Sequence, residues 1–312
     1  MSDQCRIVVT EALSSEALAW LRVRADVVEC PATGSAFADA LRSAQGLIVR
    51  TYTQVDEAVL MAAPHLLVVG RAGTGIDNID VGACQRRGVA IVNTPSANRQ
   101  AVVEYVTSIL ASTLRPQPTP ITQGLTTEEW SAARRSAITT RQMSECTLGV
   151  LGFGNIGKRV AEVAQAIGFK TQFCDVADVP ETHRSGVASV DLDTLLRTSD
   201  VLTIHVDGRP ENRHFLTSAL LDLLPMDVLL LNTSRGFIMR SADLAEAMAS
   251  RPQAHAILDV HEIEPIPDGD PLLTSPNVTL LPHAASRTEA AQRAMSWVVR
   301  EVWEVIEKKI ST

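Results

Sequence analysis

Three side chains that could move a proton and hold a carboxylate follow three apolar runs in the second half of the chain. Arg235 follows LLLNTS, Glu264 follows ILDVHEI and His283 follows VTLLP. A histidine exchanges protons near neutral pH, and a neighbouring carboxylate orients it and favours its charged form. A guanidinium grips a carboxylate through two parallel hydrogen bonds. Together these residues predict proton exchange at a carbon that carries both a hydroxyl and a carboxylate.

Each of these residues alone has an ordinary structural explanation. His283 could cap a loop, Glu264 could be a solvated turn residue before Pro265, and Arg235 could pair with a structural aspartate. Ligands of open α/β sheets bind outside the carboxyl ends of the strands, however. The occurrence of these residues, with Asp259, at successive strand ends therefore favours a catalytic set.

A glycine-rich turn opens the same half of the chain. The stretch LGVLGFGNIGKRVAEVA places Gly152, Gly154 and Gly157 between an apolar run and a helical pattern, in the spacing G-x-G-x-x-G. This arrangement is typical of a pyrophosphate-binding turn at the start of a helix. The next strand ends in Asp175, about 20 residues beyond the last glycine, where a carboxylate accepts a hydrogen bond from a ribose 2′-hydroxyl and repels a 2′-phosphate. The sequence therefore predicts a dinucleotide site that prefers NAD to NADP.

A second glycine-rich stretch, GRAGTGID at 70–77, follows another apolar run. Its spacing is G-x-x-G-x-G, and no acidic residue follows at the end of a suitable strand. A plain loop and an anion site made of backbone amides are both compatible with it.

Short apolar runs that alternate with helical patterns must position these residues. Runs at 6–10, 26–30, 46–50, 66–70 and 89–93 form a first series, and a second series begins at 147–154. Between them lie a long helical pattern at 99–114 and the proline-rich stretch RPQPTP, which ends any helix. The chain ends in one continuous helical pattern at 288–310. This alternation predicts parallel sheets with helices on both faces, arranged in two units.

Composition and charge narrow the function classes. The chain has 312 residues and a net charge of −8, which argues against nucleic acid or an anionic membrane as a partner. No apolar run approaches the roughly 18 residues of a membrane helix, and the N-terminus has no secretion signal. The five cysteines are scattered without a C-x-x-C pair, which predicts a reduced cytoplasmic compartment and no metal site.

Taken together and in this order, the motifs resemble those of the D-isomer-specific 2-hydroxyacid dehydrogenase family, most closely its phosphoglycerate dehydrogenase branch. The resemblance covers nearly the whole chain, through VVGRAGTGIDNIDV, VAIVNTPSANRQAVVEY, LGVLGFGNIGKRVA, LLLNTSRG, ILDVHEIEP and LLPHAAS. It implies two doubly wound α/β domains, with a Rossmann NAD-binding domain at 99–286 inserted into a flavodoxin-like substrate domain at 1–98 plus 287–312. It also implies a homodimer formed through the cofactor domains.

The resemblance assigns roles residue by residue. His283 becomes the general acid/base, Glu264 its partner and Arg235 the group that binds the substrate carboxylate and carbonyl oxygen. Besides the glycine turn and Asp175, the residues implied to line the cofactor are Thr74, Asn155, Ile156, Val206, Thr233, Ser234, Asp259 and Ser286. Those implied to contact substrate are Arg50, Gly73, Thr74 and Asn98, together with Arg235 and His283, so that the second glycine-rich loop becomes an anion cradle for substrate.

Some positions depart from the family pattern or leave two interpretations open. His261 stands where an aromatic residue is usual, and IMRSADL with Arg240 replaces a usual acidic pair. Arg134 and Arg135 lie where the phosphoglycerate dehydrogenase branch recruits basic residues to a second anionic group, but they equally fit an exposed basic pair on a surface helix. The sequence thus predicts NAD-dependent oxidation or reduction of a small D-2-hydroxy acid or its 2-keto acid, such as 3-phosphoglycerate. The alternative is a dinucleotide-sensing, corepressor-like interaction protein with little or no turnover.

Overall fold

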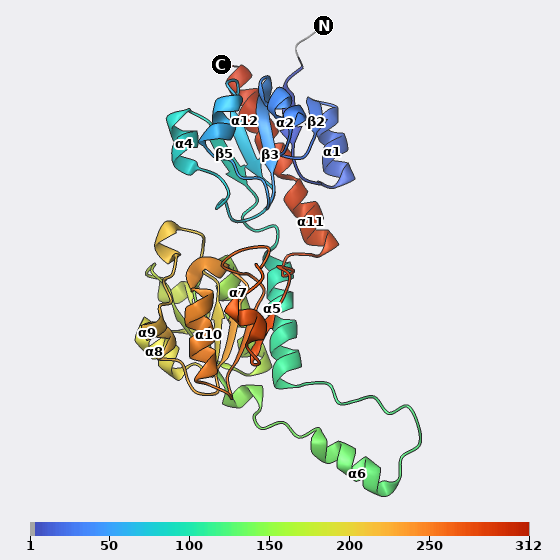
Figure 1. Ribbon diagram of the computed structural model, residues 1–312, viewed down its shortest axis with the longest axis vertical. Coiled ribbons are helices and arrows are strands. Elements are labelled where there is room, and N and C mark those ends of the chain that lie inside the picture. Colours follow the sequence, from blue (N-terminus) through green and yellow to red (C-terminus); the bar gives the residue numbers. More distant parts are fainter. Residues whose placement is uncertain (1–3, 312) are drawn as a thin grey trace. The chain divides into compact units, whose positions relative to one another are not determined.

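The computed structural model of the chain describes residues 4–311. The chain forms two compact units, Met1–Ala101 with Ser286–Thr312 and Val102–Ala285. Each unit has a parallel sheet with helices on both faces (Figure 1). The predicted α/β fold class is confirmed.

The first unit has the strand order β2-β1-β3-β4-β5 in the described part of the chain, and every pair is parallel. This is the flavodoxin-like order, in which the chain reverses direction across the sheet after β2. The strands are β1 (Arg6–Val9), β2 (Asp26–Glu29), β3 (Ala44–Val49), β4 (Val68–Arg71) and β5 (Ala90–Asn93). The helices are α1 (Ser15–Arg22), α2 (Ser35–Leu41), α3 (Glu57–Ala62), α4 (Val81–Arg86), α11 (Glu289–Ser296) and α12 (Val298–Ile310).

The last helix completes the core of the first unit. Val298, Val302 and Ile306 of α12 are fully buried, and the helix packs against β3, β4 and β5. A Cβ on Gly70 of β4 would lie 2.3 Å from Val302, so only glycine lets the helix pack this closely on the strand. The predicted single helix at 288–310 is wrong in one respect, because the chain leaves the helix at Trp297 and forms two helices.

The second unit has the strand order β12-β11-β10-β9-β6-β7-β8 among the described residues, again all parallel. The order reverses between β6 and β9, which gives the Rossmann arrangement with its ligand crevice at that switch point. The strands are β6 (Thr147–Leu151), β7 (Lys170–Cys174), β8 (Ala188–Ser189), β9 (Val201–Ile204), β10 (Leu229–Asn232), β11 (His255–Leu258) and β12 (Val278–Leu280). The α-helices are α5 (Arg99–Leu114), α6 (Thr127–Ser136), α7 (Asn155–Ile167), α8 (Leu192–Thr198), α9 (Ser218–Leu221) and α10 (Ser241–Ala249). Short 3₁₀ helices are η1 (Met143–Glu145), η2 (Glu181–His183), η3 (Pro210–Asn212), η4 (Gly236–Ile238) and η5 (Pro271–Thr274).

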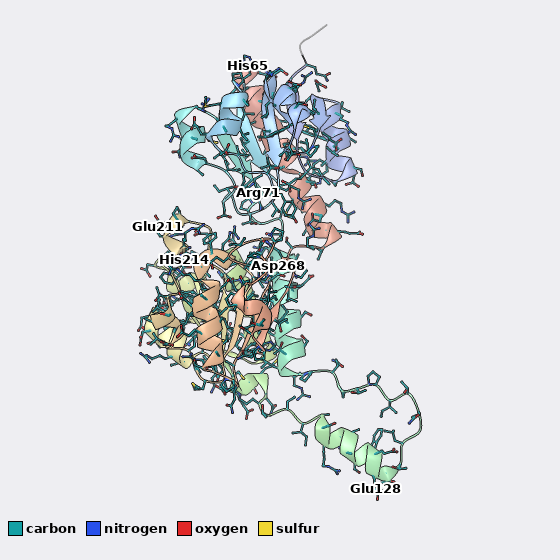
Figure 2. All side chains as sticks on the ribbon, in the orientation of Figure 1. His65, Arg71, Glu128, Glu211, His214 and Asp268 are labelled. Atoms are coloured by element: carbon teal, nitrogen blue, oxygen red, sulfur yellow. The ribbon has the colours of Figure 1, made fainter. Side chains whose placement is uncertain are left out.

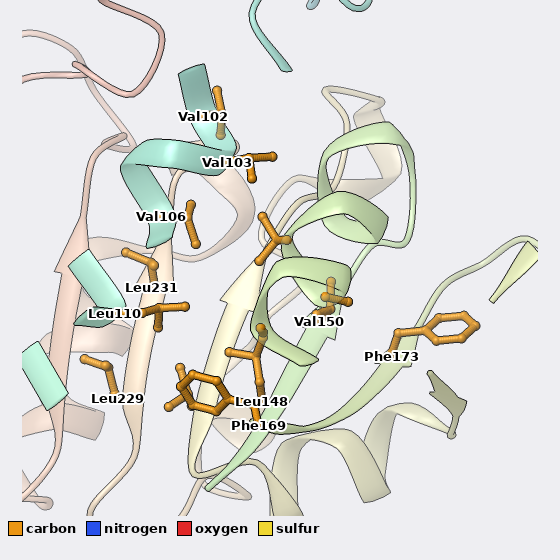
Figure 3. Packing of buried hydrophobic residues seen from close by; sticks show 14 of the residues in the cluster. Val102, Val103, Val106, Leu110, Leu148, Val150, Phe169, Phe173, Leu229 and Leu231 are labelled. Atoms are coloured by element: carbon orange, nitrogen blue, oxygen red, sulfur yellow. The ribbon is translucent and has the colours of Figure 1, made fainter. Parts of the chain in front are cut away.

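Alternating side chains of the central strands fill two cores in the second unit. Leu229 and Leu231 of β10 point to one face, where Val106 and Leu110 of α5 cover them (Figure 3). Leu230, between them, points to the opposite face and packs with residues of α8 and α10. Because both faces are covered, the strands are apolar throughout, as their sequences indicated.

The segment after α5, including α6, has no buried helix residues, unlike the helices that cover the sheets. The helix α5 ends at Leu114, directly before the proline-rich stretch, as predicted. The helix α6 then begins at a capping box in which Thr126 and Glu129 exchange hydrogen bonds, and none of its residues is buried. Glu128 marks this helix in Figure 2. Among residues 4–311, no helix combines the length and apolarity needed to cross a bilayer.

Candidate active site

The glycine-rich turn between β6 and α7 is built for close backbone contact. Gly152 has φ +91°, and a Cβ on it would lie 2.7 Å from the carbonyl oxygen of His205. A Cβ on Gly157 would lie 2.0 Å from the carbonyl oxygen of Gly152, so the third glycine lets α7 pack on the turn. Open space surrounds the Cβ position of Gly154, and α7 begins there without a side-chain cap. The turn therefore has the features of a pyrophosphate site: a tight bend, an open approach and helix N-terminal amides.

Asp175 lies directly against this turn. Its carboxylate accepts hydrogen bonds from the amide of Phe153 at 2.5 Å and from the amide of Ala177 at 2.8 Å. The Phe153 ring stacks on Phe173 of β7, with ring centroids 3.9 Å apart, and so holds the turn on the strand. The acidic residue is thus hydrogen-bonded directly to the glycine turn.

Other residues predicted to line the cofactor lie around the same edge. Asn155 and Ile156 begin α7, and Val206 follows β9 with its amide beside Gly152. Thr233 follows β10, and its buried hydroxyl oxygen has no hydrogen-bond partner among the described residues. A buried hydroxyl without a partner fits a position that a polar ligand would satisfy.

The loop after β10 orients Arg235. The Asn232 side chain accepts hydrogen bonds from the amide and the hydroxyl of Ser234, each at 3.0 Å, and donates to the carbonyl of Arg235 at 2.9 Å. The guanidinium of Arg235 donates to the Ser234 carbonyl at 2.7 Å. A buried asparagine therefore folds the end of the strand into a turn that projects the arginine at the carboxyl edge of the sheet.

His283 and Glu264 meet as a hydrogen-bonded pair. The Nδ1 atom of His283 lies 2.8 Å from Oε2 of Glu264, and Oε1 of Glu264 accepts from the amide of His261 at 3.0 Å. Burial raises the pKa of Glu264, but these two hydrogen bonds and the charges of both histidines outweigh burial and hold the pKa below its ordinary value. The carboxylate is therefore ionised at neutral pH. Since it accepts from Nδ1, the Nε2 atom of His283 is left to exchange a proton with a ligand.

Asp259, fully buried at the end of β11, holds the His283 loop in place. Its oxygens accept from the amides of Ala284 and Ala285, both at 2.8 Å, and from the hydroxyl of Tyr105 at 3.1 Å. Burial and the Asp259 carboxylate raise the pKa of Tyr105 to about 12, so its hydroxyl remains a donor. His283 itself has φ +52°, a left-handed conformation that side chains other than glycine seldom adopt. The amides that Asp259 captures directly after His283 stabilise this conformation.

The loop that follows Asp259 also touches the Arg235 turn. A Cβ on Gly236 would lie 1.9 Å from the carbonyl carbon of His261, so the two backbones are in direct contact. The Arg235 turn and the Glu264 loop are therefore packed together, and the His283 loop is bound to the Glu264 loop. The structure thus brings together in the second unit the three residues predicted to do the chemistry.

The residues predicted to bind substrate in the first unit lie at the carboxyl edge of its own sheet. Arg50 follows β3, and its guanidinium donates to the Ala12 carbonyl at 2.8 Å and to the Gln292 side chain. Thr74 donates to the Asn98 side chain at 2.6 Å. Gly73 has φ +152°, and a Cβ on it would lie 1.6 Å from the guanidinium of Arg71.

Glu11 shapes the loop that carries Arg50. Its carboxylate accepts the backbone amides of residues 50–53 at distances from 3.0 to 3.3 Å. Burial raises its pKa, but the four amides outweigh burial and lower it. Ser286 lies at the start of the C-terminal part of this unit, and its carbonyl accepts from Gln292 at 3.1 Å.

Arg134 and Arg135 occupy the last turn of α6, where both side chains are exposed. In the described part of the chain, neither forms a hydrogen bond or ion pair with another predicted site residue. Their proposed contact with a second anionic group therefore has no support within a single copy of the chain.

Several residues around the site were not predicted. Tyr105 supports Asp259, Arg71 covers Gly73, and Glu262 accepts from His214 at 2.9 Å and from the amide of Ser241 at 2.9 Å. The Tyr105 and Glu262 contacts join segments far apart in the chain, so no local sequence pattern predicts them, whereas Arg71 lies only two residues before Gly73. Among residues 4–311, no cluster of His, Cys, Asp and Glu could hold a metal ion.

Comparison with known proteins identifies related chains. The family model described as "D-isomer specific 2-hydroxyacid dehydrogenase, NAD binding domain" matches residues 110–285. A D-3-phosphoglycerate dehydrogenase of Archaeoglobus fulgidus is 32% identical over 300 residues, which cover 95% of this chain and 56% of that protein. A glyoxylate reductase of Aeropyrum pernix is 31% identical over 305 residues, which cover 95% of this chain and 91% of that protein.

Solved structures agree with these matches. The crystal structure of a glyoxylate reductase from Paecilomyes thermophila superposes with a TM-score of 0.84 at 25% identity, covering 99% of this chain and 97% of that one. The chain spans a little over half the length of the phosphoglycerate dehydrogenases that it matches.

Proposed function

This chain belongs to the D-isomer specific 2-hydroxyacid dehydrogenase family, and we propose that it is an NAD-dependent oxidoreductase acting on a small D-2-hydroxy acid or its 2-keto acid. The observation that carries the proposal is the hydrogen-bonded pair of His283 and Glu264, packed beside the Arg235 turn at the carboxyl edge of a Rossmann sheet. The proposed roles are general acid/base for His283, orientation and charge compensation for Glu264, and a carboxylate grip for Arg235.

The cofactor in this proposal is NAD, which accepts or donates the hydride. The glycine turn would hold its pyrophosphate, and Asp175 would accept from the adenosine ribose and repel a 2′-phosphate. Residues 99–286 are proposed as the NAD-binding domain, with Asp259, Thr233 and Ser234 on the nicotinamide side. Thr74 and Ser286 are proposed as further cofactor contacts.

The substrate domain is proposed to comprise residues 1–98 and 287–312. Within it, Arg50, Gly73, Thr74 and Asn98 are proposed to contact the substrate. Their place at the carboxyl edge of a parallel sheet supports this assignment. Phosphoglycerate dehydrogenases among the relatives suggest a substrate with a second anionic group, such as 3-phosphoglycerate.

We further propose a homodimer formed through the cofactor domains. In support, α6 and the preceding loop expose Ile121 and Trp130, which are 52% and 51% accessible and line a groove of about 400 Å³ with Leu125. Large exposed apolar side chains gathered on one segment are typical of an interaction surface. We propose that a second copy bound there makes the exposed Arg134 and Arg135 available to its substrate phosphate.

The cell compartment proposed is the cytoplasm, where the five free cysteines would stay reduced. Nucleic acid and membranes are not proposed as partners, because the net charge is −8. The dehydrogenase and reductase names of the relatives do not favour the corepressor-like alternative.

The proposal is tested by following NADH absorbance with purified protein and a panel of 2-keto acids. The panel includes glyoxylate, pyruvate, hydroxypyruvate and 3-phosphohydroxypyruvate. We expect oxidation of NADH with at least one member, and loss of turnover in His283→Ala and Arg235→Ala with NADH binding retained. No turnover with any member by a protein that binds NADH tightly would refute the proposal. A preference for the phosphorylated acid that disappears in the double variant Arg134→Ala/Arg135→Ala would support the second-anion contacts.

A further inference from the structure

Hydrogen bonds join the loop that carries His283 to the end of β11 and to the segment that follows it, up to Glu264. They involve residues 281, 283, 284 and 285. Before His283, the amide of Leu281 donates to the carbonyl of Leu258 at 2.8 Å. After it, Asp259 accepts from the amides of Ala284 and Ala285. The loop is thus an extension of the contact between β11 and β12 beyond the end of the strands.

The side chain of His261 forms one further hydrogen bond to this loop. The Nε2 atom of His261 lies 2.7 Å from the carbonyl oxygen of Leu281, two residues before His283. A carbonyl oxygen only accepts, so Nε2 of His261 is the donor. The backbone amide of the same residue donates to Glu264 at 3.0 Å. His261 therefore contacts Glu264 through its backbone and the loop that carries His283 through its side chain.

The backbone of His261 cannot move freely either. It is packed against Gly236, where even a methyl group would be excluded. The imidazole therefore projects from a fixed point beside the Arg235 turn and reaches the His283 loop. Pro282, between Leu281 and His283, has no amide hydrogen, so residue 282 cannot donate a backbone hydrogen bond that would hold the loop at this point.

We propose that His261 is a positioning residue: its imidazole holds the Leu281 carbonyl and thereby keeps His283 in register with Glu264. This inference rests on the proposed roles of His283 and Glu264. A phenylalanine at position 261 could fill the same space but would leave the Leu281 carbonyl without its donor. The His283 loop would then keep the Leu281 amide bond before His283 and the Asp259 bonds after it, and would lose the hydrogen bond of the Leu281 carbonyl.

The chain supplies a matched control. The Nε2 atom of His255, at the start of β11, lies 2.8 Å from the hydroxyl of Thr279 on β12. This hydrogen bond joins β11 to β12 at the start of β11, whereas the His261 bond joins the segments that follow the other ends of these two strands. Replacing His255 by Phe removes a comparable hydrogen bond without reaching the site.

The first experiment measures hydrogen–deuterium exchange by mass spectrometry in peptides covering residues 281–286. We expect faster exchange in His261→Phe than in wild type, restoration in His261→Gln, whose amide nitrogen can replace Nε2, and wild-type exchange in His255→Phe. If His261→Phe does not fold, His261→Asn, which is too short to reach the carbonyl, replaces it. Unchanged exchange in a folded His261→Phe or His261→Asn protein would overturn the inference whether or not the protein is active.

The second experiment measures kcat and KM with the best 2-keto acid and the dissociation constant of NADH. A displacement of a reacting group by about 1 Å can lower the rate on the order of a hundredfold. We therefore expect kcat of His261→Phe to fall by about tenfold to a hundredfold, while NADH binding is unchanged. His261→Gln should recover most of the lost rate, and His255→Phe should keep the wild-type kcat. If His283→Ala abolishes turnover but His261→Phe keeps the full kcat, only the positioning role is refuted. If His283→Ala itself keeps the wild-type rate, the proposed function fails instead.

Discussion

Replacing Gly236 by alanine tests whether the Arg235 turn and the Glu264 loop depend on direct backbone contact. Gly236 has no left-handed backbone conformation, so alanine adds no dihedral strain there. Its Cβ would nevertheless lie 1.9 Å from the carbonyl carbon of His261 and 2.0 Å from its oxygen. Both partners are backbone atoms, which cannot rotate away as a flexible side chain can.

The size of the effect follows from these distances. Ordinary van der Waals contact begins near 3.4 Å, so one of the two loops must retreat by about 1.5 Å. Overpacking of this kind typically costs about 1–3 kcal/mol of stability. A displacement of about 1 Å in catalytic groups can cost on the order of a hundredfold in rate, so we expect kcat/KM to fall by at least about that factor.

The assay compares steady-state kinetics, NADH binding and urea unfolding of Gly236→Ala with those of wild type. NADH binding should be retained, because the glycine turn and Asp175 follow β6 and β7, and any loss of affinity should come from the nicotinamide side, where Thr233 and Ser234 belong to the displaced turn. Gly82→Ala is the control, since a Cβ there would approach only the ends of the Arg86 and Asp80 side chains, at 3.3 and 3.5 Å. A folded Gly236→Ala protein with wild-type kcat/KM would show that the contact between the loops does not position Arg235 or Glu264.

Three further predictions concern the cofactor preference, the ionised glutamate and the support of the His283 loop. Asp175→Ser should lower kcat/KM for NADH by about tenfold and raise the use of NADPH, as measured by the ratio of the two values, because it removes the carboxylate that repels a 2′-phosphate. Glu264→Gln should be less stable than wild type near pH 7, and the difference should shrink in urea unfolding as the pH falls below 4.5. The folded pKa of Glu264 lies below this ordinary value, so the stability from its charge is present above the unfolded pKa and lost as the pH falls through the folded pKa. Tyr105→Phe should lose about 1–3 kcal/mol in urea unfolding at pH 7, since Asp259 loses a donor; an unchanged midpoint would mean that this hydrogen bond adds nothing to stability.

Much of the fold is readable from local patterns. The apolar runs became strands because side chains buried on both faces of a parallel sheet must be apolar in succession. The proline-rich stretch ends α5, and the Thr126 and Glu129 spacing of α6 is a local cap signal that could have predicted that helix. The break at Trp297 has no such signal, which is why one helix was expected where two exist.

The types of the chemical residues and their places at strand ends could likewise be predicted, because a parallel sheet brings all its carboxyl ends to one edge. Their mutual support could not. Tyr105 belongs to α5, far from Asp259 in the sequence, and donates a hydrogen bond to it. His261 follows β11 and donates a hydrogen bond to Leu281, which follows the neighbouring strand β12. Such contacts depend on which strands are neighbours in the sheet and on the direction in which each side chain points after its strand ends.

The sequence by itself therefore determined the fold class, the glycine turn with its acidic partner, and the residue types available for proton exchange and anion binding. These depend on periodicity, spacing and the chemistry of single residues. The resemblance to a known family implied the two strand orders and the return of the C-terminal helix to the first unit. Only the tertiary structure decided the break at Trp297, the left-handed backbone of His283 and the contact of Gly236 with His261. These features arise from packing between segments that are remote in the chain. Because a protein interior is close-packed, the volume of the side chains and backbone of one segment limits where the neighbouring segment can lie.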